Sequence, residues 1–229
     1  MFGCDNVVSV KLFSDPQPTP ISSWNFEDSL EDSIGGLHGS FVGNALLDDG
    51  ALVLDGTGYV KTHPIKGSLM VKTFEVWVLL HDLQPTSGGI ISLTSGNSGG
   101  FFDAIVWSEG SAHAGMWLAG SNYFTRTKVF GGLKETESIV TGAKSPVHLV
   151  MVYRNDGNIA CYRNGWLYGT PYSTEGPHTF TDPAVILFGL RHLPSYGYSN
   201  ARIYHANLYN VALEPDQVLK LYQKGHKTK

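Results

Sequence analysis

The stretch His148–Gly169, HLVMVYRNDGNIACYRNGWLYG, constrains the possible folds more than any other part of the sequence. Its first two segments, His148–Tyr153 and Ile159–Arg163, are rich in β-branched and aromatic residues and have no helical spacing, so they predict strands. Residues 155–158 tolerate positive φ, and Asn164-Gly165 is the strongest two-residue hairpin signal. Because such a meander is barely stable alone, one of its faces must be buried against a second sheet.

Composition agrees with many short strands joined by glycine turns. The 229 residues include 27 glycines, with 12% aromatic and 16% charged residues, which argues against disorder. A net charge of −4 offers no electrostatic footprint for nucleic acid or an anionic membrane, so we expect neither partner. No apolar run reaches about 18 residues, so no membrane span is expected.

Proline marks the expected domain boundary. Val7–Phe13 alternates weakly, and three prolines between Asp15 and Pro20 then interrupt regular structure. We expect an N-terminal strand and linker over residues 1–20, one domain over 21–223 and a tail over 224–229. The first ten residues do not form a signal peptide, so any targeting sequence is expected upstream in a longer parent protein.

The domain itself is expected to be an all-β sandwich. About thirteen short strands with turn signals every 8–12 residues favour that class over others. One short helix is expected at Glu214–Tyr222, where Pro215 suits the first turn. Spacing alone does not determine the topology.

Several segments, in order, resemble laminin-G-like domains of the concanavalin A-like lectin/glucanase superfamily. The resemblance covers roughly Ile21–Tyr222 and implies a two-sheet jelly roll. The segments are WNFEDSLEDSIGGLHGSFVGNALLDDGALVLDGTGYVKT (Trp24–Thr62), FEVWVLL (Phe74–Leu80), the His148–Gly169 meander and ARIYHANLYNVALEPDQVLKLY (Ala201–Tyr222).

A narrower likeness concerns three short motifs, Phe102–Val106, Ala119–Asn122 and Phe188–His192. They look like the domain inserted into large planctomycete proteins with cytochrome c-like segments. That likeness implies an exported domain attached to a larger, polysaccharide-associated protein.

The superfamily's functional residues carry over only in part. Many relatives hold calcium through an aspartate in an early acidic turn, which here matches Asp32. They often have an acidic residue in the penultimate strand, where this chain places Tyr204 or His205. Glucanases of the superfamily carry alternating carboxylates on one strand, whereas the strand here offers Glu75 without acidic partners, so glucanase chemistry is not expected.

Strand alternation suggests a sugar-binding face. If Phe74 and its alternate neighbours face the core, Glu75 and Trp77 face outward. Indoles cover the apolar faces of sugar rings, and charged groups bind their hydroxyls. The same alternation places Asp103 and Trp107 on the outer surface of another strand. Trp117 lies on a neighbouring strand, and Arg191 and His192 end a further one. The residues of the candidate face are therefore Glu75, Trp77, Asp103, Trp107, Trp117, Arg191 and His192. The alternative is that the tryptophans fill the core or cover a sheet.

The long connection between Gly120 and Ala143 is a second candidate region. It lacks clear periodicity, and connections of this length in compact domains are often functional. Asn122, Tyr123 and Arg126 combine an amide, a phenol and a guanidinium there, a combination with which loops on rigid scaffolds contact ligands. The alternative is a solvated loop whose polar side chains only tether it through hydrogen bonds.

These observations favour a non-catalytic carbohydrate-binding module of an exported protein, with a glycan or polysaccharide as partner. One alternative is a polysaccharide lyase or hydrolase using Tyr123, Arg126 and His192, or the Glu75/Asp103 pair. The other is a structural or protein-interaction domain.

Overall fold

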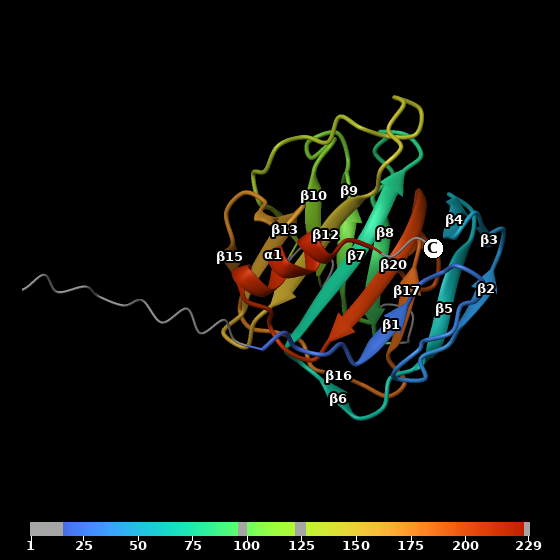
Figure 1. The fold of residues 1–229 in the computed structure, drawn as a ribbon. Helices are drawn as coiled ribbons and strands as arrows, with labels where there is room; N and C mark the ends of the chain where they lie inside the picture. The colour runs from blue at the N-terminus through green and yellow to red at the C-terminus, as the bar shows by residue number, and fades with distance from the viewer. Residues whose placement is uncertain (1–15, 96–99, 122–126, 227–229) are drawn as a thin grey trace, which may run out of the picture.

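Two antiparallel sheets lie face to face and enclose the main core (Figure 1). The computed structural model describes residues 16–95, 100–121 and 127–226. Within them, all pairs between strands are antiparallel, and one helix is present. The all-β sandwich with one short C-terminal helix is thus confirmed.

The first layer, which we call the nine-strand sheet, contains the meander. β12, β13 and β14 follow one another in sequence and are neighbours in the sheet, as predicted. In sheet order, the strands are β14 (Trp166–Leu167), β13 (Asn158–Arg163), β12 (Val147–Tyr153), β7 (Lys72–Leu80), β20 (Asn200–Tyr209), β4 (Ala51–Asp55) and β3 (Leu46–Asp48), with β1 (Ser22–Trp24) beside β20 and β15 (Tyr172–Ser173) beside β13.

The second layer, the seven-strand sheet, lies behind the first in Figure 1. Its strands in order are β11 (Lys128–Val129), β10 (Trp117–Ser121), β9 (Phe102–Trp107), β8 (Gly88–Thr94), β17 (Val185–Phe188), β5 (Tyr59–Pro64) and β2 (Gly39–Val42). Two small pairs complete the fold: β6 (Ser68–Leu69) with β16 (Phe180–Thr181), and β18 (Leu190–His192) with β19 (Tyr196–Tyr198).

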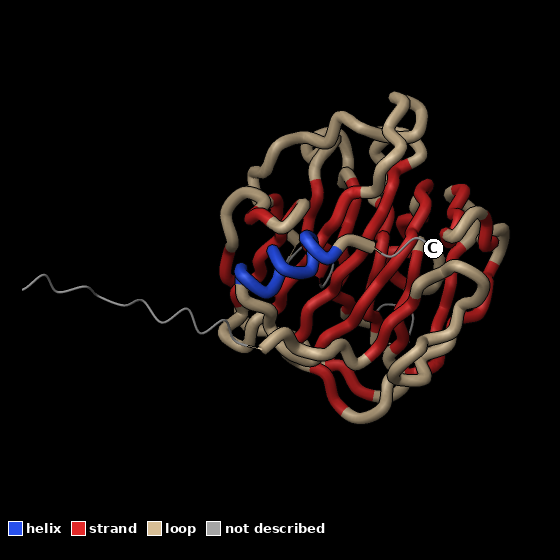
Figure 2. Tube along the Cα trace, viewed as in Figure 1, coloured by secondary structure: helices blue, strands red, loops and turns tan. Residues whose placement is uncertain are grey.

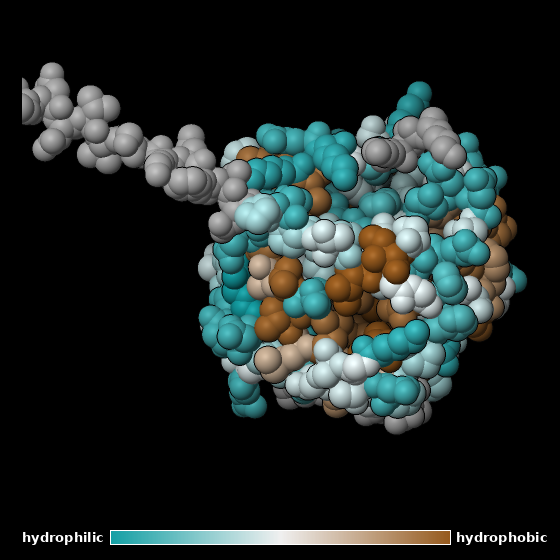
Figure 3. Space-filling model, turned by 60° about the horizontal axis from the view of Figure 1, so that its bottom comes forward, coloured by the Kyte–Doolittle hydropathy of each residue, from teal (hydrophilic) through white to brown (hydrophobic). Residues whose placement is uncertain are grey.

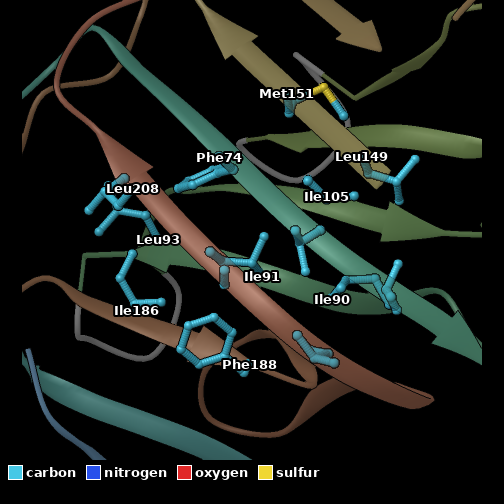
Figure 4. Close-up of a cluster of buried hydrophobic side chains, with 14 of the residues drawn as sticks. Phe74, Ile90, Ile91, Leu93, Ile105, Leu149, Met151, Ile186, Phe188 and Leu208 are labelled. Atoms are coloured by element: carbon cyan, nitrogen blue, oxygen red, sulfur yellow. The ribbon is translucent and has the colours of Figure 1, made fainter. Parts of the chain in front are cut away.

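The main core lies between the two sheets. Phe74 of β7 and Met151 of β12 point from the nine-strand sheet toward Ile91 and Phe188 of the other sheet (Figure 4). Alternate residues on each strand supply this layer, as the period of two requires.

Helix α1 (Pro215–Lys224) covers part of the outer face of the nine-strand sheet (Figures 1 and 2). Glu214 and Gln217 form a capping box, and Pro215 begins the helix. Val218 and Leu221 pack in a second apolar cluster with residues of β12, β13 and β20. The helix predicted over Glu214–Tyr222 is therefore confirmed.

The predicted strands His148–Tyr153 and Ile159–Arg163 are present within one residue as β12 and β13. The predicted strand Val7–Phe13 lies outside the described residues, and the division into linker, domain and tail stays a prediction. Among the described residues, the only helix is too short and too polar to cross a membrane.

Candidate functional site

Glu75 and Trp77 lie on the outer face of the nine-strand sheet, as alternation predicts, but both are buried. Glu75 accepts hydrogen bonds from Asn207 Nδ2 (2.8 Å) and the Tyr209 hydroxyl (2.9 Å), and it lies 3.1 Å from His148 Nε2. Burial alone would raise the pKa of Glu75, but His148 and Asn207 more than offset it, and the pKa lies below its ordinary value.

Asp103 and Trp107 point into the sandwich, so the prediction that they face outward is wrong. The alternation on β9 places Ile105 and Trp107 in the main core and Phe102 on the opposite face. Trp107 is 2% exposed and Trp117 1% exposed, and their rings pack 4.8 Å apart. Both tryptophans therefore fill the core.

Asp103 is tolerated in the core because a cation from the other sheet meets it. Lys72 Nζ lies 2.8 Å from Asp103 Oδ2, with both side chains fully buried. Ser121 donates a hydrogen bond to the same carboxylate. Lys72 also lies over the rings of Tyr153 and Phe180, at 5.0 and 4.8 Å from their centroids. Buried charges need such partners.

Arg191 and His192 lie on the opposite side of the molecule from Glu75 and Trp77. β18 packs on the outer face of the seven-strand sheet, where the His192 ring stacks 4.8 Å from Phe102. Arg191 is buried and pairs with Glu109 at 2.6 Å. The predicted residues therefore do not meet in one groove.

The Glu75/Asp103 pair considered for hydrolysis is not assembled either. Glu75 lies outside the nine-strand sheet, whereas Asp103 points from the other sheet into the core. The predicted loop residues Asn122, Tyr123 and Arg126 lie outside the described residues.

The Asp32 carboxylate organises its own turn. Oδ1 accepts from the backbone N–H groups of Ser23, Ile34 and Gly35, and Oδ2 from that of Leu37, at 2.9–3.0 Å. Burial would raise the pKa of Asp32, but these four bonds together lower it. In the described part of the chain, no three His, Cys, Asp or Glu side chains are grouped to hold a metal. Calcium at Asp32 stays a prediction.

A solvent-exposed tryptophan lies elsewhere, at the edge of the nine-strand sheet. Trp166 of β14 is 67% exposed and borders a hollow of about 580 Å³. We call it the Trp166 hollow. It lies between β13–β14 and the loop 131–137, and its lining includes Leu133, Lys134, Glu135, Glu137, Arg163 and Trp166.

The hairpin turn sets the position of Arg163 beside Trp166. Asn164 and Gly165 both have positive φ, 51° and 81°, as a two-residue hairpin requires. Arg163 and Trp166 are direct cross-strand partners, so their side chains lie on the same face. Asn164 Oδ1 also accepts from the backbone N–H of His148 at 3.0 Å, which ties the turn to β12.

The buried carboxylate of Glu135 holds the Arg163 guanidinium in place. Arg163 Nε and Nη2 donate to Glu135 Oε2 and Oε1 at 2.9 and 2.8 Å, a bidentate geometry that fixes both groups. Trp117 Nε1 donates to Glu135 Oε2 at 3.3 Å from below. Two of the five guanidinium N–H groups are used by Glu135, which leaves donors for a ligand. Trp117 thus contributes to this site from the core, through Glu135.

A second hollow of about 430 Å³ adjoins the first, because Arg163 and Glu137 line both. We call it the Tyr222 hollow. Tyr222 stacks on Trp77, with ring centroids 5.9 Å apart and planes at 16°. His226 and Asn164 complete its polar lining.

Other hollows are less suited to a sugar. One of about 280 Å³ is lined by Ile21, Leu37, Ile65 and Leu69, and Figure 3 shows hydrophobic side chains around a hollow at this end of the sandwich. Another, of about 510 Å³, lies over β4 and β20. Neither has a tryptophan, tyrosine or phenylalanine in its lining.

Sequence reasoning missed Trp166, Arg163 and Glu135. A signal was present for the first two, since residues flanking an Asn-Gly turn are cross-strand partners on one face. Glu135 had no such signal, because it reaches Arg163 from a loop without periodicity.

Comparison with known proteins identifies the fold family. The family model described as the concanavalin A-like lectin/glucanases superfamily matches residues 54–219. No curated protein matches the chain.

Solved structures with similar folds share little sequence with this chain. Domain 4 of AbnA, an extracellular arabinanase from Geobacillus stearothermophilus in complex with arabinotriose, is 21% identical with a TM-score of 0.67, over 91% of this chain and all of that one. Trypanosoma rangeli sialidase in complex with sialic acid is 14% identical (TM-score 0.66, 94% of this chain and 35% of that one). The binding domain of botulinum neurotoxin DC, in complex with rat synaptotagmin II, is 16% identical (TM-score 0.60, 89% and 51%).

Proposed function

The chain belongs to the concanavalin A-like lectin/glucanases superfamily, and on that premise we propose that it is a non-catalytic carbohydrate-binding module whose ligand lies in the Trp166 hollow. The observation that carries this proposal is the exposed indole of Trp166 beside the Arg163 guanidinium, which Glu135 holds in place. An indole packs against the apolar face of a sugar ring, and a fixed guanidinium donates to its hydroxyls.

The arabinanase domain, which this chain covers completely, supports the proposal because it was solved with arabinotriose. The sialidase was solved with sialic acid, but this chain spans only about a third of it. The toxin domain was solved with a protein, synaptotagmin II, so a protein partner is the outcome against which sugar binding must be tested.

The wider setting is part of the same proposal. A polysaccharide-binding module would act outside the cytoplasm and as one part of a longer chain. The narrower likeness to domains inserted in planctomycete proteins is consistent with that setting and stays a prediction.

A glycan array tests the proposal. The wild-type chain is expected to bind a subset of polysaccharides, and Trp166→Ala to lose that binding with an unchanged melting temperature. Tyr196→Ala is the matched control, because Tyr196 is also an exposed aromatic residue, 48% exposed, but lies in the β18–β19 pair on the other sheet. Wild-type binding to no glycan, or equal binding by Trp166→Ala, would contradict the proposal.

A further inference from the structure

The two hollows beside Arg163 are continuous in their lining. Arg163 and Glu137 border both the Trp166 hollow of about 580 Å³ and the Tyr222 hollow of about 430 Å³. Each volume lies within the range of small-molecule sites. A ligand that filled both hollows would have to pass Arg163 and Glu137, which line both.

Each hollow has its own aromatic surface. Trp166 supplies it in the first, and Tyr222 in the second. Tyr222 is fixed by its stacking on Trp77, and His226 lies 4.8 Å from the Trp77 ring. Two aromatic surfaces with a hydrogen-bonding group between them match a chain of sugars better than a single ring.

The charges that line the hollows balance. Arg163 and Lys134 are basic, whereas Glu135 and Glu137 are acidic. The Arg163 charge is compensated directly by Glu135 in their bidentate pair. Burial lowers the pKa of His226, so it adds no positive charge near neutral pH. These four side chains carry no net charge, so the lining offers no excess positive charge to a carboxylate-bearing sugar.

We propose that the two hollows form one groove for a neutral oligosaccharide of several units, with Trp166 and Tyr222 in separate subsites. This inference rests on the proposed function and adds the length and charge of the ligand.

Calorimetric titration with sugars of defined length tests the groove. The probes are arabino-, xylo- and cello-oligosaccharides of one to six units, with sialyllactose and oligogalacturonate as anionic counterparts. Affinity for the neutral series that binds is expected to rise at least tenfold between one and four units. The anionic probes are expected to bind at least tenfold more weakly than neutral probes of equal length.

Variants separate the two subsites. Trp166→Ala is expected to weaken binding of every length at least tenfold. Tyr222→Ala is expected to remove the gain of the longer probes and leave the shortest unchanged. His226→Ala should act in the same direction. Because His226 lies beyond the end of α1 at Lys224, this variant replaces Tyr222→Ala as the test of the second subsite if Tyr222→Ala unfolds.

The outcomes distinguish the two proposals. The two-subsite groove is contradicted if binding depends on Trp166 but not on the length of the sugar. It is also contradicted if both the Tyr222 and the His226 variants bind the longer probes as the wild type does. In either case the proposed carbohydrate-binding function still holds. Tighter binding of an anionic probe overturns the charge assignment. Binding that is insensitive to Trp166→Ala overturns the proposed function itself.

Discussion

Arg163 and Trp166 are direct partners across the Asn164-Gly165 turn, so one two-residue loop fixes both candidate ligand contacts. The turn also rests on α1. A Cβ atom at Gly165 would lie 3.0 Å from both Leu219 Cδ1 and Tyr222 Cβ. The hairpin and the helix therefore constrain each other.

Gly165→Ala should destabilise the chain through backbone strain at positive φ and through close contacts of the new Cβ atom with α1. Positive φ costs a non-glycine residue about 1 kcal/mol or more, and the tight contacts with the helix add to it. Gly50→Ala is the matched control, since Gly50 has a φ of 69° and open space where the Cβ would be. Urea denaturation should show the larger loss for Gly165→Ala. Equal losses would show that the contact with α1 is unimportant.

The Lys72–Asp103 ion pair should show strong coupling. Lys72→Met leaves a buried carboxylate without its cation, which should cost about 3–5 kcal/mol. The double variant Lys72→Met/Asp103→Leu should recover most of that loss, because an apolar pair needs no dehydration of charge. The measurement is a double-mutant cycle, in which the free energies of unfolding of Lys72→Met, Asp103→Leu and the double variant are compared with that of the wild type. A double variant as unstable as the sum of the singles would contradict the account.

His205 should make stability fall as the pH falls. Burial lowers its pKa in the folded state, with Lys224 and His226 acting in the same direction and Glu75 opposing them. The unfolded chain, with its ordinary pKa of 6.5, binds the proton first, so the free energy of unfolding decreases as pH drops through that value.

The measurement is the urea midpoint at pH values of about 7.5 and 5.5. The His205→Gln variant should lose less stability than the wild type over this interval. His226 and His192 also have lowered pKa values, so only the difference between the two proteins is attributed to His205. Identical losses would contradict the assignment.

Asp32 provides a test of the calcium prediction. Asp32→Ala leaves four backbone N–H groups without their acceptor, and each such group costs about 1–3 kcal/mol if it stays buried. Asp32→Asn keeps an acceptor oxygen and should be milder. If calcium binds there, millimolar calcium raises the melting temperature of the wild type but not of Asp32→Asn. No shift in the wild type would rule out the site.

Local patterns predicted the architecture because it depends on strand alternation and turn chemistry. The Asn-Gly turn, the apolar alternation of β7 and the capped helix are each visible within a dozen residues. The superfamily resemblance agrees with the family match over residues 54–219.

The orientation of β9 could not be predicted in this way. Both of its faces are buried, because the β18–β19 pair covers the side that carries Phe102. Asp103 seemed the natural outward residue, yet Lys72 of the other sheet neutralises it in the core. Lys72 is 31 residues away from Asp103 in sequence (103 − 72), and no local sequence pattern predicts their contact.

The most direct test of the account is the indole N–H spectrum of the chain's five tryptophans during titration with a glycan that binds. We predict that the Trp166 signal, assigned from the Trp166→Phe variant, shifts most, while that of core residue Trp107 stays in place. A Trp166 signal that does not move at saturation would contradict the claim that the sugar packs on its ring.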